Sequence, residues 1–185
     1  MGCEGYSMSN TCWLPQLECY QSNTDWQEYE DLLYEIFHHD FIETIPHYNG
    51  KQVKIKRYPI DFNKEDAFYH VTCKDYKGEG TRDPDMRRCE RIRWIRAFID
   101  NNCDTTNCSE CDGIKVWVEP YKNKKRVHIL LEEEKYMVVL EHRAQTSAHP
   151  ENYLLITAFY FDYEHALEKK LKHYEKYKNQ VFMMK

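Results

Sequence analysis

Residues 126–161 read RVHILLEEEKYMVVLEHRAQTSAHPENYLLITAFYF, and this stretch decides the class of fold. It contains three β-prone runs, Arg126–Glu132, Tyr136–His142 and Tyr153–Phe161, which charged segments separate. Strands that follow one another so closely pair antiparallel, because parallel strands need a long crossover connection. We therefore expect an antiparallel sheet here, with a further strand over Ile114–Val118 on its N-terminal side.

Upstream of this sheet, the sequence predicts one helix and two short strands. Asp25 is a good N-cap residue, and apolar side chains recur at helical spacing from Trp26 to His38. Lys51–Tyr58 alternates apolar residues with lysines, as a half-buried strand does, and Phe68–Cys73 is rich in residues that favour strands.

Two further helices complete the expected order of elements. Asp83 and Pro84 predict the start of a helix that runs to about Asn101, since an acidic N-cap followed by proline is a strong start signal. Asp162 is expected to cap a final, heavily charged helix. This order indicates an α+β fold, with N-terminal helices followed by an antiparallel β-sheet of about four to five strands and a C-terminal helix.

The totals are typical of one globular domain. The chain has 185 residues, of which 42% are hydrophobic and 15% aromatic, which is enough for a single core. Residues 1–24 lack periodicity and are expected to form an irregular, loosely docked arm on a single α+β domain over residues 25–185. No apolar run approaches the ~18 residues of a membrane span, and the N-terminus has no basic leader with an apolar core. We therefore expect no membrane partner and a cytoplasmic location.

Arginines are concentrated in one place although the formal net charge of the chain is −5. Six of them fall within fifteen residues, at Arg82, Arg87, Arg88, Arg91, Arg93 and Arg96. The planar guanidinium fork fits phosphate oxygens, so the cluster is a candidate site for a phosphodiester or another anion. The alternative is a solvated helix face paired with some of the 31 acidic residues.

A helical projection divides these arginines into two groups. Arg88 lies on the apolar stripe that continues through Ile92, Ile95 and Ile99, and Arg91 flanks this stripe. A charge on the buried side of a helix needs a partner or a ligand, and acidic partners such as Glu90 or Glu132 are the alternative to a ligand. Arg93 and Arg96 point away from the stripe, so only an accessory backbone-contact role is expected for them.

Two other segments carry candidate catalytic groups. His70 stands in FYHVT, and a histidine can move the proton that RNA cleavage requires when a 2′-hydroxyl attacks the adjacent phosphate. Thr157 and Tyr160 stand in the most apolar strand, where they share a face only if a bulge re-aims one of them. Thr157 could offer a hydroxyl to a phosphate oxygen, or it could simply pack or bond locally, just as His70 could be a structural histidine.

Cysteines Cys103, Cys108 and Cys111 form a C-x4-C-x2-C pattern in a polar loop. Zinc prefers tetrahedral sets of thiolates, and only one close pair is present here, so a fourth ligand such as Cys73 or Cys89 would have to come from elsewhere. Reduced thiols are favoured over a structural zinc site.

Several of these segments in this order resemble a known group of proteins. The segments are FYHVT, RDPDMRRCERIRWIRAFIDN, HILLE, YMVVLEHR, YLLITAFY and HALEKKL. They resemble small bacterial and phage-associated toxin-like proteins of the barnase–EndoU–colicin–RelE (BECR) superfamily of metal-independent ribonucleases, over roughly residues 25 to 178. The Cys-bearing loop and the net acidic charge depart from that resemblance.

The resemblance implies a nuclease-like domain that cleaves RNA, such as tRNA or ribosome-associated mRNA, without a cofactor, and a cognate inhibitor protein as a partner. His70, Arg88, Arg91, Thr157 and Tyr160 would form the catalytic set. RNA-binding residues would be Arg82, Arg87, Arg93 and Arg96. The alternative is a non-catalytic interaction protein on a degenerate nuclease scaffold, which grips an anion, a nucleic acid or an acidic protein.

Overall fold

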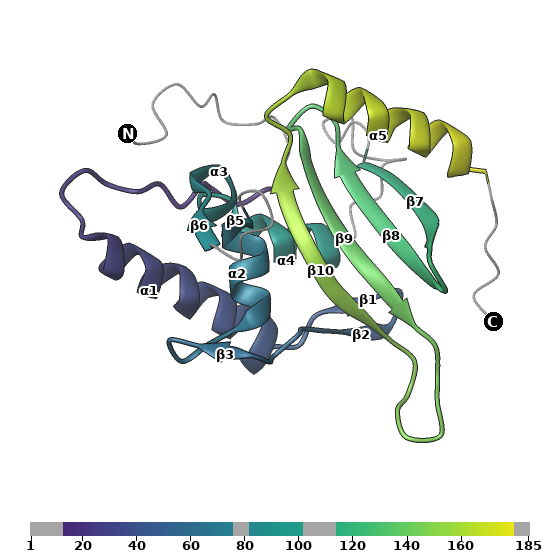
Figure 1. The fold of residues 1–185 in the computed structure, drawn as a ribbon, viewed down its shortest axis with the longest axis horizontal. Helices are drawn as coiled ribbons and strands as arrows, with labels where there is room; N and C mark the ends of the chain where they lie inside the picture. Colours follow the sequence, from purple (N-terminus) through teal and green to yellow (C-terminus); the bar gives the residue numbers. More distant parts are fainter. Residues whose placement is uncertain (1–12, 76–81, 102–113, 180–185) are drawn as a thin grey trace.

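A six-stranded sheet organises the computed structural model of the protein, which describes residues 13–75, 82–101 and 114–179 (Figure 1). The strand order is β1-β2-β10-β9-β8-β7, and neighbouring strands pair antiparallel except β2 and β10, which are parallel. The bounds are β1 (His47–Tyr48), β2 (Lys51–Lys54), β7 (Ile114–Tyr121), β8 (Lys124–Leu131), β9 (Tyr136–Arg143) and β10 (Asn152–Tyr160). The α+β prediction is confirmed, and the described sheet has more strands than the four to five expected.

The four long strands fall where the β-prone runs predict them, each within a few residues at its ends. Strand β9 is buried along nearly its whole length, because it is central in the sheet and both faces are covered. The parallel pair β2 and β10 was not expected. It joins a strand from the first third of the chain to the last strand, and nothing local to either segment indicates that pairing.

Helices cover both faces of the sheet (Figure 1). Helix α1 (Trp26–His38) begins as predicted at Asp25, whose carboxylate accepts a hydrogen bond from the backbone N–H of Gln27, and a π-helical turn over His39–Glu43 extends it. Together with α2 (Asp66–Thr72), α3 (Met86–Cys89) and α4 (Ile92–Asp100), it builds the larger core on one face. Helix α5 (Glu164–Tyr177) covers a smaller core on the other face.

The prediction of a strand over Phe68–Cys73 is wrong, because most of this segment forms α2. Every residue of α2 except His70 is buried, so packing against the core overrides the strand preference of Val71 and Thr72. Only Cys73 belongs to a strand, the short β5 (Cys73–Asp75). The strand predicted over Lys51–Tyr58 ends at Lys54 in β2. A small hairpin of β3 (Ile60–Asp61) and β4 (Lys64–Glu65) then leads into α2.

The predicted helix start at Asp83 and Pro84 is also wrong. Both residues lie in β6 (Arg82–Pro84), which pairs antiparallel with β5. The cap is Asp85, whose carboxylate accepts a hydrogen bond from the N–H of Arg87, while its own N–H bonds to the carbonyl of Thr72. The helix then breaks between α3 and α4, where Arg91 has φ −103° and ψ 19°. The second acid of the DPD sequence therefore provides the start signal.

Two other expectations near the chain ends need correction. Asp162 does not cap α5, whose N-cap is Tyr163 without a side-chain hydrogen bond. The described part of the N-terminal arm, residues 13–24, has no helix or strand, yet it packs closely on the core. The indole N–H of Trp94 donates to the carbonyl of Pro15 at 2.9 Å, and the ring of Trp13 meets that of Phe98 edge-on at 5.1 Å.

Among the described residues, no helix has the length and apolar character needed to cross a membrane.

A polar cluster lies between the sheet and α5. His128 on β8 is 5% exposed, and its ring stacks on Trp117 with 4.9 Å between centroids. Its Nε2 is 3.6 Å from the carboxylate of Glu119, which also bonds to His173 of α5 at 2.9 Å. Burial, together with the nearby cation of Lys170, lowers the pKa of His128 to about 4, and the attraction of Glu119 opposes this only in part.

This depressed pKa predicts a stability loss in mild acid. An unfolded chain protonates this histidine near pH 6.5, whereas the folded protein resists protonation down to about pH 4. The contribution of neutral His128 to the free energy of unfolding is therefore complete above pH 6.5. It is lost as the pH falls toward 4, by about 3 kcal/mol in total. Urea unfolding of the wild type and of His128→Gln across this window should show a steeper pH dependence in the wild type.

The exposed His149 offers a matched control for this comparison. His149→Gln should keep the pH dependence of the wild type, because the exposed His149 lies outside the buried cluster of His128, Glu119 and Lys170. Parallel pH profiles for the wild type and His128→Gln would contradict the assignment.

Candidate active site around His70

Helix α2 places an imidazole against a buried carboxylate. Asp66 and His70 are one helical turn apart, so their side chains lie on the same face. Nε2 of His70 is 3.0 Å from an oxygen of Asp66. The histidine side chain is 52% exposed, whereas the Asp66 side chain is 1% exposed. A solvent-facing imidazole thus has a fixed acidic partner behind it.

Two cations also meet the same carboxylate. The ammonium of Lys56, in the segment after β2, is 2.6 Å from Asp66, and the guanidinium of Arg82 on β6 donates to its other oxygen. Burial alone would raise the pKa of Asp66, but the hydrogen bonds from Lys56 and Arg82 outweigh this effect and the pKa is lowered. Asp66 is therefore ionised at neutral pH, and the group carries a positive charge even before His70 is protonated.

The backbone of His70 is held from two directions. Nη1 of Arg88 donates to the His70 carbonyl at 3.1 Å, and the Thr157 hydroxyl of β10 donates to the same oxygen at 3.1 Å. Arg88 also donates to the carbonyl of Cys73 at 2.9 Å, and its Nε lies 3.3 Å from the carboxylate of Asp85. The last carbonyls of a helix lack hydrogen-bond donors within the helix. Here the Arg88 guanidinium and the Thr157 hydroxyl are the donors to one of these carbonyls. The Arg88 and Thr157 side chains therefore meet at the backbone oxygen of His70 and not at its imidazole, and a shared catalytic role for the three residues stays a prediction.

Tyr160 lies beside the same group because of a β-bulge. The register between β10 and β9 shifts between Leu155 and Thr157. Beyond this point Tyr160 packs against the larger core, on the face that α1 to α4 cover, while Phe159 packs against the smaller core on the α5 side. The guanidinium of Arg87 lies 4.5 Å from the centre of the Tyr160 ring, and that of Arg91 lies 4.8 Å from it. The face of this ring is therefore engaged with cations of the protein itself.

Most of the arginine cluster makes contacts within the protein. Arg91 is 4% exposed, donates to the carbonyl of Arg87 and lies 3.7 Å from Glu90, the acidic partner weighed from the sequence. Arg93 pairs with Glu18 of the arm. Arg96 pairs with Asp100 and also bonds to the carbonyls of Asp40 and Thr44, which ties α4 to the end of the π-helical turn. These contacts stabilise the fold, and an RNA-binding role for Arg93 and Arg96 stays a prediction.

An ion-pair network connects the start of the Arg-rich segment and Lys74 of β5 to Asp162, which follows the last strand. Lys74 lies between Asp85 at 2.8 Å and Asp162 at 2.7 Å, and Arg87 is 3.4 Å from Asp162. With Arg88 also beside Asp85, three cations share two carboxylates. This network adjoins the His70 group through Arg88 and adds to its positive charge.

Sequence reasoning missed Asp66, Lys56, Lys74 and Asp85 as members of this region. The i,i+4 spacing of Asp66 and His70 is a usable signal, but only once the segment is known to be helical. Lys56 and Lys74 have no such local signal, because each reaches its acid across a chain reversal.

Metal binding by the predicted cysteines cannot be placed on this structure, because Cys103, Cys108 and Cys111 lie outside the described residues. The two other candidate ligands, Cys73 and Cys89, are buried free thiols, and burial raises the pKa of both, which disfavours the thiolate form that binds zinc. In the described part of the chain, no group of three or more His, Cys, Asp or Glu side chains is arranged to hold a metal ion.

Comparisons with known protein families, with curated proteins and with solved structures find no match for this chain. The resemblance to the BECR ribonucleases therefore stays a prediction from the sequence, and the functional argument has to come from the geometry of the site.

The contacts of Arg88 predict a substitution effect. Arg88 reaches two carbonyls through Nη1 and Asp85 through Nε, and the single ammonium nitrogen of a lysine cannot occupy both positions. Arg88→Lys should therefore lower the free energy of unfolding by about 1–3 kcal/mol. Urea denaturation monitored by circular dichroism measures this loss.

Arg93→Lys is the matched control, because Arg93 is more exposed and forms a surface ion pair with Glu18. Its substitution should cost less than about 1 kcal/mol. Equal losses of unfolding free energy in the two variants would show that the hydrogen bonds of Arg88 to the His70 and Cys73 carbonyls stabilise the protein no more than a surface ion pair does.

Proposed function

We propose that the protein is a metal-independent endoribonuclease that cleaves RNA by attack of a 2′-hydroxyl on the adjacent phosphate. The observation that carries the proposal is the half-exposed imidazole of His70, held by the buried Asp66 between the cations of Lys56 and Arg82. This reaction needs a base for the 2′-hydroxyl, positive charge beside the phosphate and a proton for the leaving oxygen.

The hydrogen bond to Asp66 decides which nitrogen of His70 is the base. An ionised carboxylate only accepts hydrogen bonds, so Nε2 of His70 carries the proton that is shared with Asp66. In the neutral ring the lone pair is then on Nδ1. In the proposed reaction Nδ1 removes the 2′-hydroxyl proton, and the 2′-oxygen forms a bond to phosphorus.

The cations supply the electrostatic part of the proposed reaction. Negative charge develops on the non-bridging oxygens as the phosphorane forms, and Lys56 and Arg82 stand on either side of the carboxylate that fixes them. The bond from phosphorus to the 5′-oxygen then breaks, and the 5′-oxygen takes a proton, for which the Lys56 ammonium is the candidate donor. The products would be a 2′,3′-cyclic phosphate and a 5′-hydroxyl.

The other residues of the predicted catalytic set receive positioning roles in this proposal. Arg88 and Thr157 hold the His70 carbonyl and therefore fix the end of α2. Arg91 and Tyr160 pack together beside them. Arg87, which is exposed, remains a candidate contact for the RNA backbone, whereas Arg82 moves from that role into the catalytic group.

A second function has one observation in its favour. All six clustered arginines form an ion pair with a carboxylate of the chain, so each has a structural role in the fold. This is the arrangement expected of a scaffold that no longer cleaves RNA and that binds an anion, a nucleic acid or an acidic partner through its remaining exposed cations.

Incubation of purified protein with total RNA in EDTA separates the two functions. The enzyme should generate fragments with 2′,3′-cyclic phosphate ends, and His70→Ala should slow this cleavage by about 10²–10⁴-fold. Asp66→Asn should also slow it, because an amide has no negative charge and only one acceptor oxygen for the three donors His70, Lys56 and Arg82. End-specific ligation and gel analysis of the fragments provide the measurement.

His149→Ala is the control for histidine loss at an exposed position, and circular dichroism verifies that each variant is folded. Intact RNA at high wild-type concentration, with retained RNA binding, would favour the non-catalytic function instead.

A further inference from the structure

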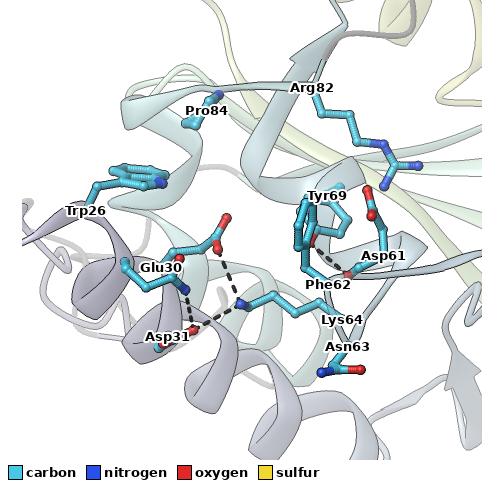
Figure 2. Close-up of a pocket in the computed structure, with 11 residues that line it drawn as sticks. Trp26, Glu30, Asp31, Asp61, Phe62, Asn63, Lys64, Tyr69, Arg82 and Pro84 are labelled. Atoms are coloured by element: carbon cyan, nitrogen blue, oxygen red, sulfur yellow. Dashed lines mark hydrogen bonds and ion pairs between the residues drawn. The ribbon is translucent and has the colours of Figure 1, made fainter.

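We propose that a hollow beside the His70 group binds one nucleobase of the RNA and prefers bases that carry an exocyclic amino group. The inference rests on the proposed function, because it assigns a base subsite next to the proposed phosphate site. The hollow has a volume of about 650 Å³, and Arg82 is one of the residues that line it (Figure 2). The Arg82 guanidinium also bonds to Asp66. The Arg82 guanidinium therefore belongs both to the hollow and to the His70 group.

Aromatic side chains give this hollow its capacity for stacking. Trp26 of α1, Phe62 of the β3–β4 turn and Tyr69 of α2 all line it, and Figure 2 shows Trp26 and Arg82 at opposite ends of the view. The Arg82 guanidinium lies 4.8 Å from the centre of the Tyr69 ring. Stacking of a base on an aromatic ring contributes to binding whatever the base is, so these rings supply affinity without selecting the base.

Phe62 is the least expected of these residues. Its side chain is 83% exposed, and its backbone has a φ of +45° in the two-residue turn, next to Asn63 at +62°. Glycine, asparagine and aspartate suit such turns, whereas a bulky residue at positive φ is strained. A solvent-exposed phenyl ring in a strained turn contributes little to the fold, and strain of this kind clusters at ligand-binding positions. Because Phe62 lines the hollow, we assign its ring as a surface on which the nucleobase stacks.

The rest of the hollow is held in place before any ligand arrives. Lys64, which is 6% exposed, bonds to Glu30 at 3.3 Å and to Asp31 at 3.0 Å, and thereby joins the hairpin to α1. The Tyr69 hydroxyl donates to the carbonyl of Asp61 at 3.0 Å and joins the hairpin to α2. Binding therefore requires little ordering of these walls.

Charge determines which part of a nucleotide fits here. The hollow presents three carboxylates, Glu30, Asp31 and Asp61, against the two cations Lys64 and Arg82. This surplus of negative charge repels a phosphate, while carboxylate oxygens accept hydrogen bonds from amino groups. The positive His70 group next to it has the opposite preference. A nucleotide can meet both preferences if its base lies in the acidic hollow and its phosphate lies at Arg82, beside the positive His70 group.

The amino group gives a sharp experimental contrast, because cytosine and uracil differ at ring position 4, where one has an amino group and the other a carbonyl. Fluorescence anisotropy at low ionic strength should be measured with 2′-O-methyl pentamers of cytidine and of uridine, which cannot undergo 2′-hydroxyl attack. We expect the cytidine pentamer to bind the full-length wild type several-fold more tightly.

Phe62→Gly tests the stacking surface without a risk to the fold, since glycine relieves the positive-φ strain. It should weaken binding of the cytidine pentamer by about tenfold, with a thermal midpoint that is unchanged or higher. Phe62→Tyr should restore the affinity. Tyr163→Ala removes another exposed ring, one that does not line the hollow, and it should bind like the wild type.

Equal affinity for the two pentamers, equal affinity of the wild type and Phe62→Gly, or no binding of either pentamer would each overturn this inference. The binding measurement is independent of cleavage. A protein that cleaves RNA in EDTA but shows none of these differences refutes the base subsite alone, whereas pentamer binding without RNA cleavage refutes the endoribonuclease alone.

Discussion

The buried carboxylate of Asp66 is the constraint on which the proposed site depends. An ionised carboxylate without water is costly unless cations and hydrogen bonds replace its hydration, and Asp66 is 1% exposed. Lys56, His70 and Arg82 provide this compensation from the segment after β2, from α2 and from β6. The contacts that offset the desolvation cost of the Asp66 carboxylate therefore also bring three separate parts of the chain together. They orient the His70 imidazole at the same place.

The sheet gives this point its fixed position. Helix α2 packs against β10, and the Thr157 hydroxyl and the Arg88 guanidinium both end on the His70 carbonyl. Thr157 reaches that oxygen from a strand whose register shifts at the bulge, and Arg88 reaches it from α3. The orientation of His70 is thus fixed twice, at the ring by Asp66 and at the backbone by the sheet. A site built on such supports needs little rearrangement to bind a ligand.

The sequence predicts those features that local patterns determine. The cap at Asp25 and the apolar spacing of α1 are local, and so is the high content of strand-favouring residues in the four long strands. Helix α2 could not be predicted, because Val71 and Thr72 favour a strand and only burial against the core keeps them helical. For the same reason the Asp66–His70 pair was not visible, since its i,i+4 spacing has meaning only on a helix. The inward direction of Arg88 was predicted correctly, but its partners are carbonyls that no residue pattern specifies.

The net negative charge of the chain does not oppose an anionic ligand at this place. Charges on the surface are screened beyond about 8–10 Å at physiological ionic strength, so a ligand at His70 responds mainly to Lys56, Arg82 and the nearby network of Lys74, Arg87 and Arg88. In that network three cations face two carboxylates, and in the His70 group two permanent cations face one. The hollow on the other side of Arg82 has the reverse balance. A chain of alternating phosphates and bases meets both requirements at neighbouring positions, whereas a free inorganic anion or a neutral ligand meets only one of them.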